Sequence, residues 1–292
     1  MAKDPYAEAA YHAEKVLRER NIASLPVDPM AIAKVAGIEV MAKPASAAGV
    51  SGMLLKVGDR FGITYATHID NSGFQRFSVS HELGHYFLPG HVDAVLGADN
   101  RHESCAGFAS KDRYEREADH FAAALLMPKQ PFTDAMRRAG DGLAAIEKLR
   151  EQCDTSLIAT AIRYMQCCKD PMAVVLSTGN QINYCVMSDS LKDVRGLDWI
   201  RKSEAVPNGT VTHTFNQDVD RVRRGERDNG RSNMQDWFYG GPRVDICEEV
   251  IGLGNYGKTL TVLWDIALPE DADDEADDEA SLIESWTPRF KR

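Results

Sequence analysis

The sequence predicts an α+β protein with a mainly helical N-terminal part, one small β-hairpin within that part, and a β-rich C-terminal part. Three observations lead to this fold class. Apolar residues recur at helical spacing over much of residues 5–166, and capping residues flank those runs. Residues 52–66 instead alternate as two strands around a Gly-Asp turn. From Pro171 onward, segments rich in valine and isoleucine, separated by Gly-Asn turns, replace the helical spacing.

The N-terminal helices follow from local signals. Residues 5–20 are expected to form a helix, because their apolar residues recur every three or four positions. Pro29 can open a short helix that Gly37 closes. Further helices are expected over Phe77–Leu88, which Pro89-Gly90 stops, and from about Asp112 to Met127, which Pro128 ends.

Residues 142–166 are expected to form two more helices, the second capped by Asp154 or Thr155. Their apolar spacing is similar to half of a helix-turn-helix motif, although ordinary helix packing explains the pattern better. The C-terminal strands are expected within "MAVVLSTGNQINYCVM" and "VDICEEVIGLGNYGKTLTVLWDIAL".

The charge distribution argues against a nucleic-acid-binding protein. The net charge is −10, but Glu270–Glu279 alone carries eight acids and no base, which leaves about −2 for the rest of the chain. A nearly neutral body offers no basic face to a phosphate backbone, so no direct nucleic-acid binding is expected. The acidic run is predicted to be a solvated, disordered tail.

Cysteine usage and hydropathy indicate a cytoplasmic protein. The six cysteines are scattered without a CxxC pair, which favours reduced thiols over a disulfide framework. No apolar run approaches the roughly 18–20 residues that a membrane span needs. The polar N-terminus, "MAKDPYAEAAYHAEK", is unlike a secretory signal peptide.

The motif "HELGH" at residues 81–85 predicts a zinc site. Residues four apart lie on one face of a helix, so His81 and His85 can present ring nitrogens to the same ion. Glu82 lies about 100° around the helix, where it can take a proton from an attacking water without being a ligand. The surrounding helix is largely apolar, so two histidines and a glutamate there require buried partners.

Three residues compete for the third protein ligand. His91 stands where metzincins place their last histidine, but that pattern needs a glycine at position 88, and this sequence has Leu88. Glu115 and Asp119, four residues apart, lie on one flank of the helix "DRYEREADHFAAALLMP", and Glu117 lies on the other. Glu115 is favoured, because a second carboxylate one turn further on can orient a ligating histidine.

The glycine-rich segment "GLGNYGKT" at Gly252–Thr259 matches two phosphate-binding patterns, but both require a helix to follow. The next residues, "TLTVLWDIAL", alternate like a strand, so the segment is interpreted as a hairpin turn. The histidines outside the motif, apart from His91, are expected to be surface or hydrogen-bonded residues: His12, His68, His102, His120 and His213.

The motifs "RFSVSHELGHYFL" and "YEREADHFAAALLMP", preceded by "LPVDPMAIAKVAGIEV" and "SGMLLKV", resemble the ImmA/IrrE family of metallopeptidases over about residues 8–165. The resemblance implies a gluzincin-like zinc peptidase with His81, His85 and Glu115 as ligands and Glu82 as base. Asp119 stands where many members have Asn. Family members cleave, or promote cleavage of, helix-turn-helix repressors of the XRE type, which derepresses stress or mobile-element genes.

We therefore expect a zinc metallopeptidase domain at 1–135, a helix-turn-helix-like helical segment at 136–169, and a GAF-like α+β sensor domain at 170–267. The acidic tail occupies 268–292. The expected function is a cytoplasmic zinc endopeptidase that makes a limited cleavage in a protein, with a helix-turn-helix repressor as its substrate. The alternative is a regulatory binding or sensor module with a peptidase-like fold and little hydrolytic activity.

Overall fold

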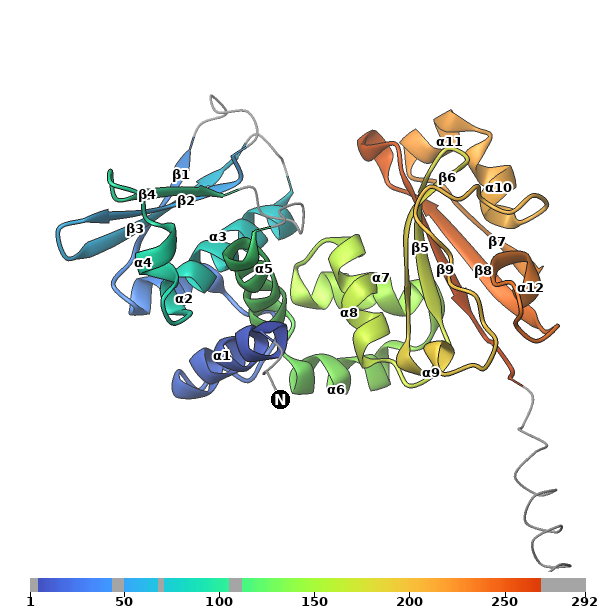
Figure 1. The fold of residues 1–292 in the computed structure, drawn as a ribbon, viewed down its shortest axis with the longest axis horizontal. Coiled ribbons are helices and arrows are strands. Elements are labelled where there is room, and N and C mark those ends of the chain that lie inside the picture. The colour runs from blue at the N-terminus through green and yellow to red at the C-terminus, as the bar shows by residue number, and fades with distance from the viewer. Residues whose placement is uncertain (1–4, 44–49, 68–70, 105–111, 269–292) are drawn as a thin grey trace, which may run out of the picture. The chain divides into compact units, whose positions relative to one another are not determined.

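The structure is a computed structural model that describes residues 5–43, 50–67, 71–104 and 112–268. The predicted acidic tail and Cys105 lie outside these residues. The chain divides into two compact units, Met1–Cys168 and Lys169–Arg292. Each unit has its own hydrophobic core, with one cluster in the first unit and two in the second among the described residues. The predicted α+β class is confirmed, with helices and a sheet in both units (Figure 1).

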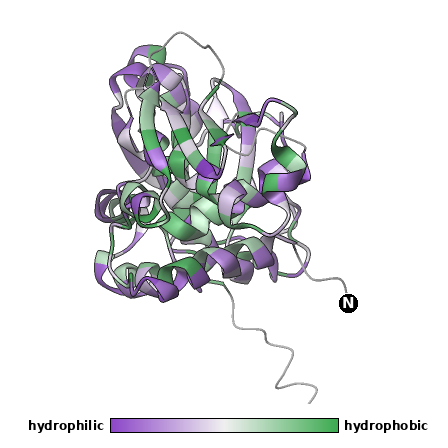
Figure 2. Ribbon diagram, turned by 90° about the vertical axis from the view of Figure 1, so that its left-hand side faces the viewer, coloured by the Kyte–Doolittle hydropathy of each residue, from purple (hydrophilic) through white to green (hydrophobic). Residues whose placement is uncertain are grey.

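The first unit is mainly helical, and its helices are α1 (Pro5–Glu19), α2 (Pro29–Val35), α3 (Ser72–Phe87), α4 (His91–Val95), α5 (Arg113–Leu126), α6 (Lys129–Ala139), α7 (Gly142–Cys153) and α8 (Leu157–Cys167). Asp28 caps α2 and Asp112 caps α5, each by accepting hydrogen bonds from backbone N–H groups of the first turn. Apolar and polar residues alternate along the helices (Figure 2). In α1 the apolar positions, among them Ala13 and Leu17, are the buried ones, as the spacing predicts.

A four-stranded sheet completes the first unit, with the order β1-β3-β2-β4. Its strands are β1 (Glu39–Lys43), β2 (Gly52–Val57), β3 (Arg60–Ala66) and β4 (Arg101–Ser104). The predicted hairpin of β2 and β3 is confirmed. Strand β4 pairs with the side of β2 that faces away from β3. The hairpin is therefore interior to the sheet, and β4 forms the edge next to β2.

Two helix starts differ from the sequence prediction. Helix α3 begins at Ser72, five residues before Phe77, and the side chain of Asn71 caps it. A Cβ added to Gly73 would lie 2.7 Å from the backbone of Thr155, so the early turn of α3 packs closely on the α7–α8 connection. Helix α8 is capped by Ser156, not by Asp154 or Thr155, because Ser156 accepts a hydrogen bond from Ala159 N–H.

The second unit is built on a five-stranded antiparallel sheet with the order β6-β5-β9-β8-β7. Its strands are β5 (Ala173–Thr178), β6 (Gln181–Met187), β7 (Arg227–Asn233), β8 (Asp245–Gly252) and β9 (Thr259–Trp264). Its helices are α9 (Asp189–Lys192), α10 (Val211–Asn216), α11 (Val219–Arg224), α12 (Met234–Trp237) and the 3-10 helix η1 (Gly254–Tyr256). Because η1 only connects the antiparallel strands β8 and β9, "GLGNYGKT" is a turn, as predicted.

None of the helices in the described part of the chain is long and apolar enough to cross a membrane.

Candidate metal centre

Helix α3 carries the histidine motif in its last two turns. Every residue from Ser78 to His85 is buried, including His81, Glu82 and His85. The β2–β3 hairpin and helix α5 both pack against α3. Because positions i and i+4 share a face, His81 and His85 direct their rings to the same side of the helix. Their Nε2 atoms lie 3.1 Å apart.

Helix α5 supplies the acidic side chains opposite this face. The two helices approach closely where Gly84 of the histidine motif faces Ala118, since a Cβ on Gly84 would lie 3.0 Å from the Ala118 Cα. This small-residue contact brings Glu115 and Asp119, one turn apart, alongside the histidines. Glu115 and Asp119, which are four residues apart in the sequence, therefore lie on the face of α5 that packs against α3.

His81, His85 and Glu115 form the one group of three metal-binding side chains found in the described residues. Glu115 Oε2 lies 3.5 Å from His81 Nε2, and Glu115 Oε1 lies 3.2 Å from His85 Nε2. A tetrahedral zinc site with bonds of about 2.0–2.1 Å separates its ligand atoms by roughly 3.3 Å. The two ring nitrogens and the Glu115 carboxylate oxygens therefore already lie close to the spacing that one zinc ion requires.

Asp119 orients His81 from the far side of the ring. Its Oδ1 lies 2.8 Å from His81 Nδ1, which leaves Nε2 directed toward Glu115. Burial opposes charge on His81, but hydrogen bonds with Asp119 and Glu115 outweigh it and raise the pKa of this histidine to about 10. A metal ion at this place would have to displace that proton.

The other two members of the group have pKa values that favour metal binding. Burial lowers the pKa of His85 to about 4, so its ring is neutral at pH 7. Burial opposes ionisation of Glu115, but hydrogen bonds with His102, His81 and His85 prevail and hold the pKa of its carboxyl well below the ordinary value. The group thus combines a neutral imidazole and a carboxylate, both of which can donate electron pairs.

Glu82 differs from its neighbours because both of its carboxylate oxygens are buried without a hydrogen bond to any described residue. Burial raises the pKa of Glu82 to about 7, although the nearby His81 acts in the opposite direction. An unpartnered buried carboxylate is costly, which is typical of a group retained for chemistry rather than for stability.

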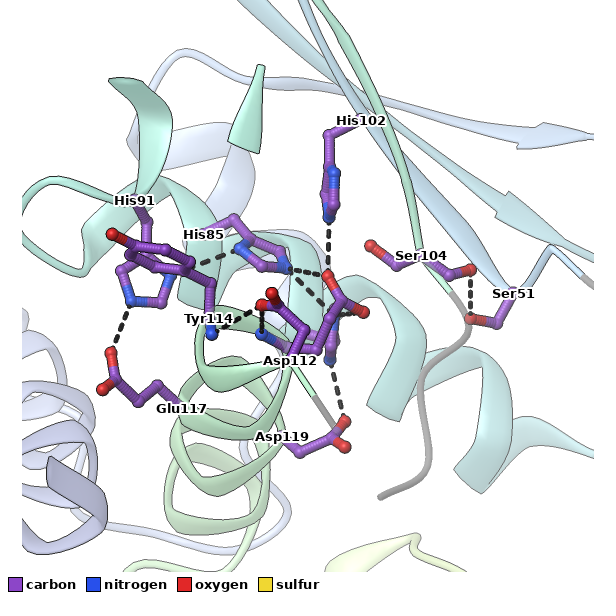
Figure 3. A network of polar contacts seen from close by, with 11 residues as sticks. Ser51, His85, His91, His102, Ser104, Asp112, Tyr114, Glu117 and Asp119 are labelled. Atoms are coloured by element: carbon purple, nitrogen blue, oxygen red, sulfur yellow. Dashed lines mark hydrogen bonds and ion pairs between the residues drawn. The ribbon is translucent and has the colours of Figure 1, made fainter. Parts of the chain in front are cut away.

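The two alternative third ligands, His91 and Glu117, contact each other. His91 also contacts His85, but at Nδ1 and not at the nitrogen that faces Glu115. His91 Nε2 lies 2.9 Å from Glu117 Oε2, and His91 Nδ1 lies 3.3 Å from His85 Nδ1. Both residues therefore lie behind His85, on the side of its ring opposite Nε2 (Figure 3).

His102, expected to be a surface or hydrogen-bonded histidine, contacts the candidate metal centre itself, a position that the sequence does not indicate. It lies on the edge strand β4, and its Nε2 is 2.7 Å from Glu115 Oε1. Its ring also packs edge-to-face against His85, with 4.6 Å between centroids. The sequence signal was weak, because a four-residue strand without apolar alternation gives little indication of what it pairs with.

Comparison with known proteins agrees with this geometry. Residues 33–165 match the family model Peptidase_M78, described as the IrrE N-terminal-like domain. No curated protein sequence matches the chain. Among solved structures, the chain is similar to one titled Mycobacterium tuberculosis transcriptional regulator, with a TM-score of 0.52 and 14% identity. The similarity covers 87% of this chain and 76% of that one, and at this identity it shows the fold alone. Residues 33–165 of this chain therefore form an IrrE N-terminal-like domain of the Peptidase_M78 family.

Proposed function

We propose that the chain is a zinc-dependent endopeptidase whose metal is held by His81, His85 and Glu115 and whose general base is Glu82. One observation carries the proposal: the Nε2 atoms of His81 and His85 lie 3.1 Å apart, each within 3.5 Å of a Glu115 carboxylate oxygen, beside a buried carboxylate that has no hydrogen-bond partner among the described residues. Two imidazoles and one carboxylate are the donor set of many catalytic zinc sites, which keep a fourth position open. Membership in a peptidase family supports the same reaction class.

Zinc bound there would act as a Lewis acid and make nearby water more acidic. The chain itself supplies the proton acceptor. With a pKa of about 7, Glu82 is partly ionised at neutral pH and can take a proton from a water attacking a peptide carbonyl. It can then return that proton to the amine that leaves. Because burial excludes bulk water from Glu82, the proton has few competing acceptors.

The edge strand β4 offers a way to hold an extended substrate. On the side away from β2, β4 has no neighbouring strand among the described residues. Its residue His102 reaches Glu115, so a peptide added to this edge would run past the metal centre. Pairing through main-chain hydrogen bonds selects exposed, extended segments and rejects compact cores. This favours a single cleavage in a loop or linker over general digestion.

We infer from the family resemblance that the substrate is a helix-turn-helix repressor of the XRE type. Such repressors have an exposed linker between their DNA-binding and dimerising parts, and cutting there would abolish dimerisation. Cleavage would then derepress stress or mobile-element genes. The similar Mycobacterium tuberculosis structure is titled a transcriptional regulator. This title supports a regulatory setting for the proposed activity.

The direct test is incubation of the full chain and zinc with the helix-turn-helix repressor encoded nearest to its gene. We expect one cut, found by mass spectrometry of the fragments, and little digestion of casein. Glu82→Gln should abolish the cut, since it removes the base and leaves the three proposed ligands in place. Cleavage by Glu82→Gln at the normal rate would contradict the assigned base. Indiscriminate digestion of unfolded proteins would contradict the proposed selectivity.

The second unit supports an alternative, a regulatory binding module with little hydrolysis. It has its own core and a cavity of about 200 Å³ lined by residues that include Trp199, Trp237 and Tyr239. Two of these aromatic side chains, Trp199 and Tyr239, are largely exposed. If no candidate repressor is cut but one is bound equally by the wild type and Glu82→Gln, this alternative replaces the peptidase.

A further inference from the structure

His85 contacts a second buried histidine through the ring nitrogen that faces away from the candidate metal centre. His85 Nδ1 lies 3.3 Å from His91 Nδ1. The other nitrogen of His91, Nε2, lies 2.9 Å from Glu117 Oε2. Figure 3 shows the His91 side chain between those of His85 and Glu117. Glu117 Oε1 in turn accepts a hydrogen bond of 2.6 Å from Arg113 Nε.

The elements that carry these residues hold them in place. His91 is the first residue of α4, directly after Gly90, whose φ of +77° turns the chain back from the end of α3. Glu117 lies on α5, and its carboxylate reaches His91 across the space between α5 and α4. The Tyr114 ring packs edge-on against His91, with 5.0 Å between centroids. His91 is 1% exposed and Glu117 7%, so bulk water does not compete strongly for these hydrogen bonds.

The hydrogen bonds can be satisfied in only one way if His85 binds a metal. To donate a lone pair from Nε2, neutral His85 must carry its proton on Nδ1. That N–H can donate only to a lone pair on His91 Nδ1, which leaves the proton of neutral His91 on Nε2. His91 Nε2 then donates to the Glu117 carboxylate. Each ring is thereby fixed in one tautomer and one orientation.

We propose that His91 and Glu117 are positioning residues that hold His85 in its metal-binding tautomer and orientation. They would do for His85 what Asp119 does for His81, with an imidazole inserted between ligand and carboxylate. This inference rests on the proposed metal site, and it gives a role to the two residues that the sequence offered as alternative third ligands. Partners of this kind typically contribute 10–100-fold to metal affinity.

Two substitutions of His91 separate hydrogen bonding from packing. His91→Phe keeps a planar ring between His85 and Tyr114 but removes both nitrogens. His91→Gln keeps one acceptor and one donor on a side chain of similar reach. Chelator competition should show zinc binding weakened about 10–100-fold in His91→Phe, with most of that loss restored in His91→Gln. The visible spectrum of the cobalt-substituted protein should change in His91→Phe and return toward the wild type in His91→Gln.

Glu117→Met tests the carboxylate that ends this set of contacts, because it keeps a side chain of similar length and removes the acceptor for His91 Nε2. It should weaken zinc binding in the same direction as His91→Phe. The double variant His91→Phe/Glu117→Met should be no worse than His91→Phe alone, because Glu117 is proposed to act through His91. Tyr114→Phe is the matched control, since it retains the ring against His91 and should leave zinc affinity unchanged.

The outcomes separate this inference from the metal site itself. If the wild type binds zinc, His81→Ala does not, and both His91→Phe and Glu117→Met bind as tightly as the wild type, the positioning role is wrong while the site stands. Additive losses in the double variant would also overturn the role. If the wild type binds no zinc, the proposed function and this inference fail together. Should metal-free His91→Phe not fold, Glu117→Met still decides the matter, because zinc binding as tight as in the wild type would overturn the role.

Discussion

Gly52 of strand β2 lies directly against the carboxylate of Glu82: a Cβ added to Gly52 would lie 2.5 Å from Glu82 Oε1. No side chain larger than hydrogen fits there without moving the glutamate. Because β2 is paired on both sides, with β3 and with β4, its backbone cannot easily retreat. The sheet therefore sets the position of the proposed base.

We predict that Gly52→Ala displaces Glu82 and lowers turnover by about 10²-fold, the cost typical of a misplacement near 1 Å, while zinc content is retained. Gly62→Ala on the adjacent strand β3 is the matched control. Its Cβ would lie 2.9 Å from Leu55 Cδ1, the end of a flexible side chain that can move. Steady-state cleavage rates with metal analysis of both variants check this. Wild-type turnover by Gly52→Ala would contradict the placement of the base.

A second prediction concerns Asp119, which lies 2.8 Å from His81 Nδ1. Asp119→Ala removes the acceptor that fixes the His81 ring, and we expect zinc affinity to fall about 10–100-fold. Asp119→Asn should lose much less, because its side-chain oxygen can still accept the hydrogen bond. Chelator competition on both variants measures the difference. Equal losses in the two would show that the charge of Asp119, not its hydrogen bond, matters.

A third prediction follows from the division of the chain. The hydrophobic cluster that includes Leu54, Leu83 and Phe121 lies wholly within Met1–Cys168, and those of the second unit lie within Lys169–Arg292. A fragment ending at residue 168 should therefore unfold cooperatively and bind zinc, with altered regulation or substrate choice. Thermal unfolding with and without zinc checks this. An unfolded fragment would mean that the two units depend on a shared core.

The sequence predicted the central part of the site because its signals are local. His81 and His85 are four residues apart, and so are Glu115 and Asp119. This spacing by itself places each pair on one face of a helix. The pairing of His91 with Glu117 was not predicted, because these residues are 26 positions apart and become partners only when α4 and α5 both pack against α3. The same holds for His102, whose strand β4 is defined by its pairing with β2.

Tertiary contacts also explain the errors in element boundaries. The start of α3 was predicted too late because Ser72-Gly73 has low helix propensity, but Gly73 is needed where the helix meets Thr155. In the second unit, Glu248 lies in β8, within a segment for which the sequence predicts only strands. It is fully buried and accepts hydrogen bonds from Thr212, Ser232 and Trp237, which come from three separate segments. No local pattern identifies such a network.

The central claim, a zinc ion held by His81, His85 and Glu115, is tested most directly by the metal content of protein purified without added metal. Elemental analysis should find close to one zinc per chain in the wild type and in Glu82→Gln, and almost none in His81→Ala or Glu115→Ala. Glu117→Ala and His91→Ala should keep far more zinc than Glu115→Ala does. A metal-free wild type with full activity, or a Glu115→Ala variant that retains stoichiometric zinc, would contradict the account.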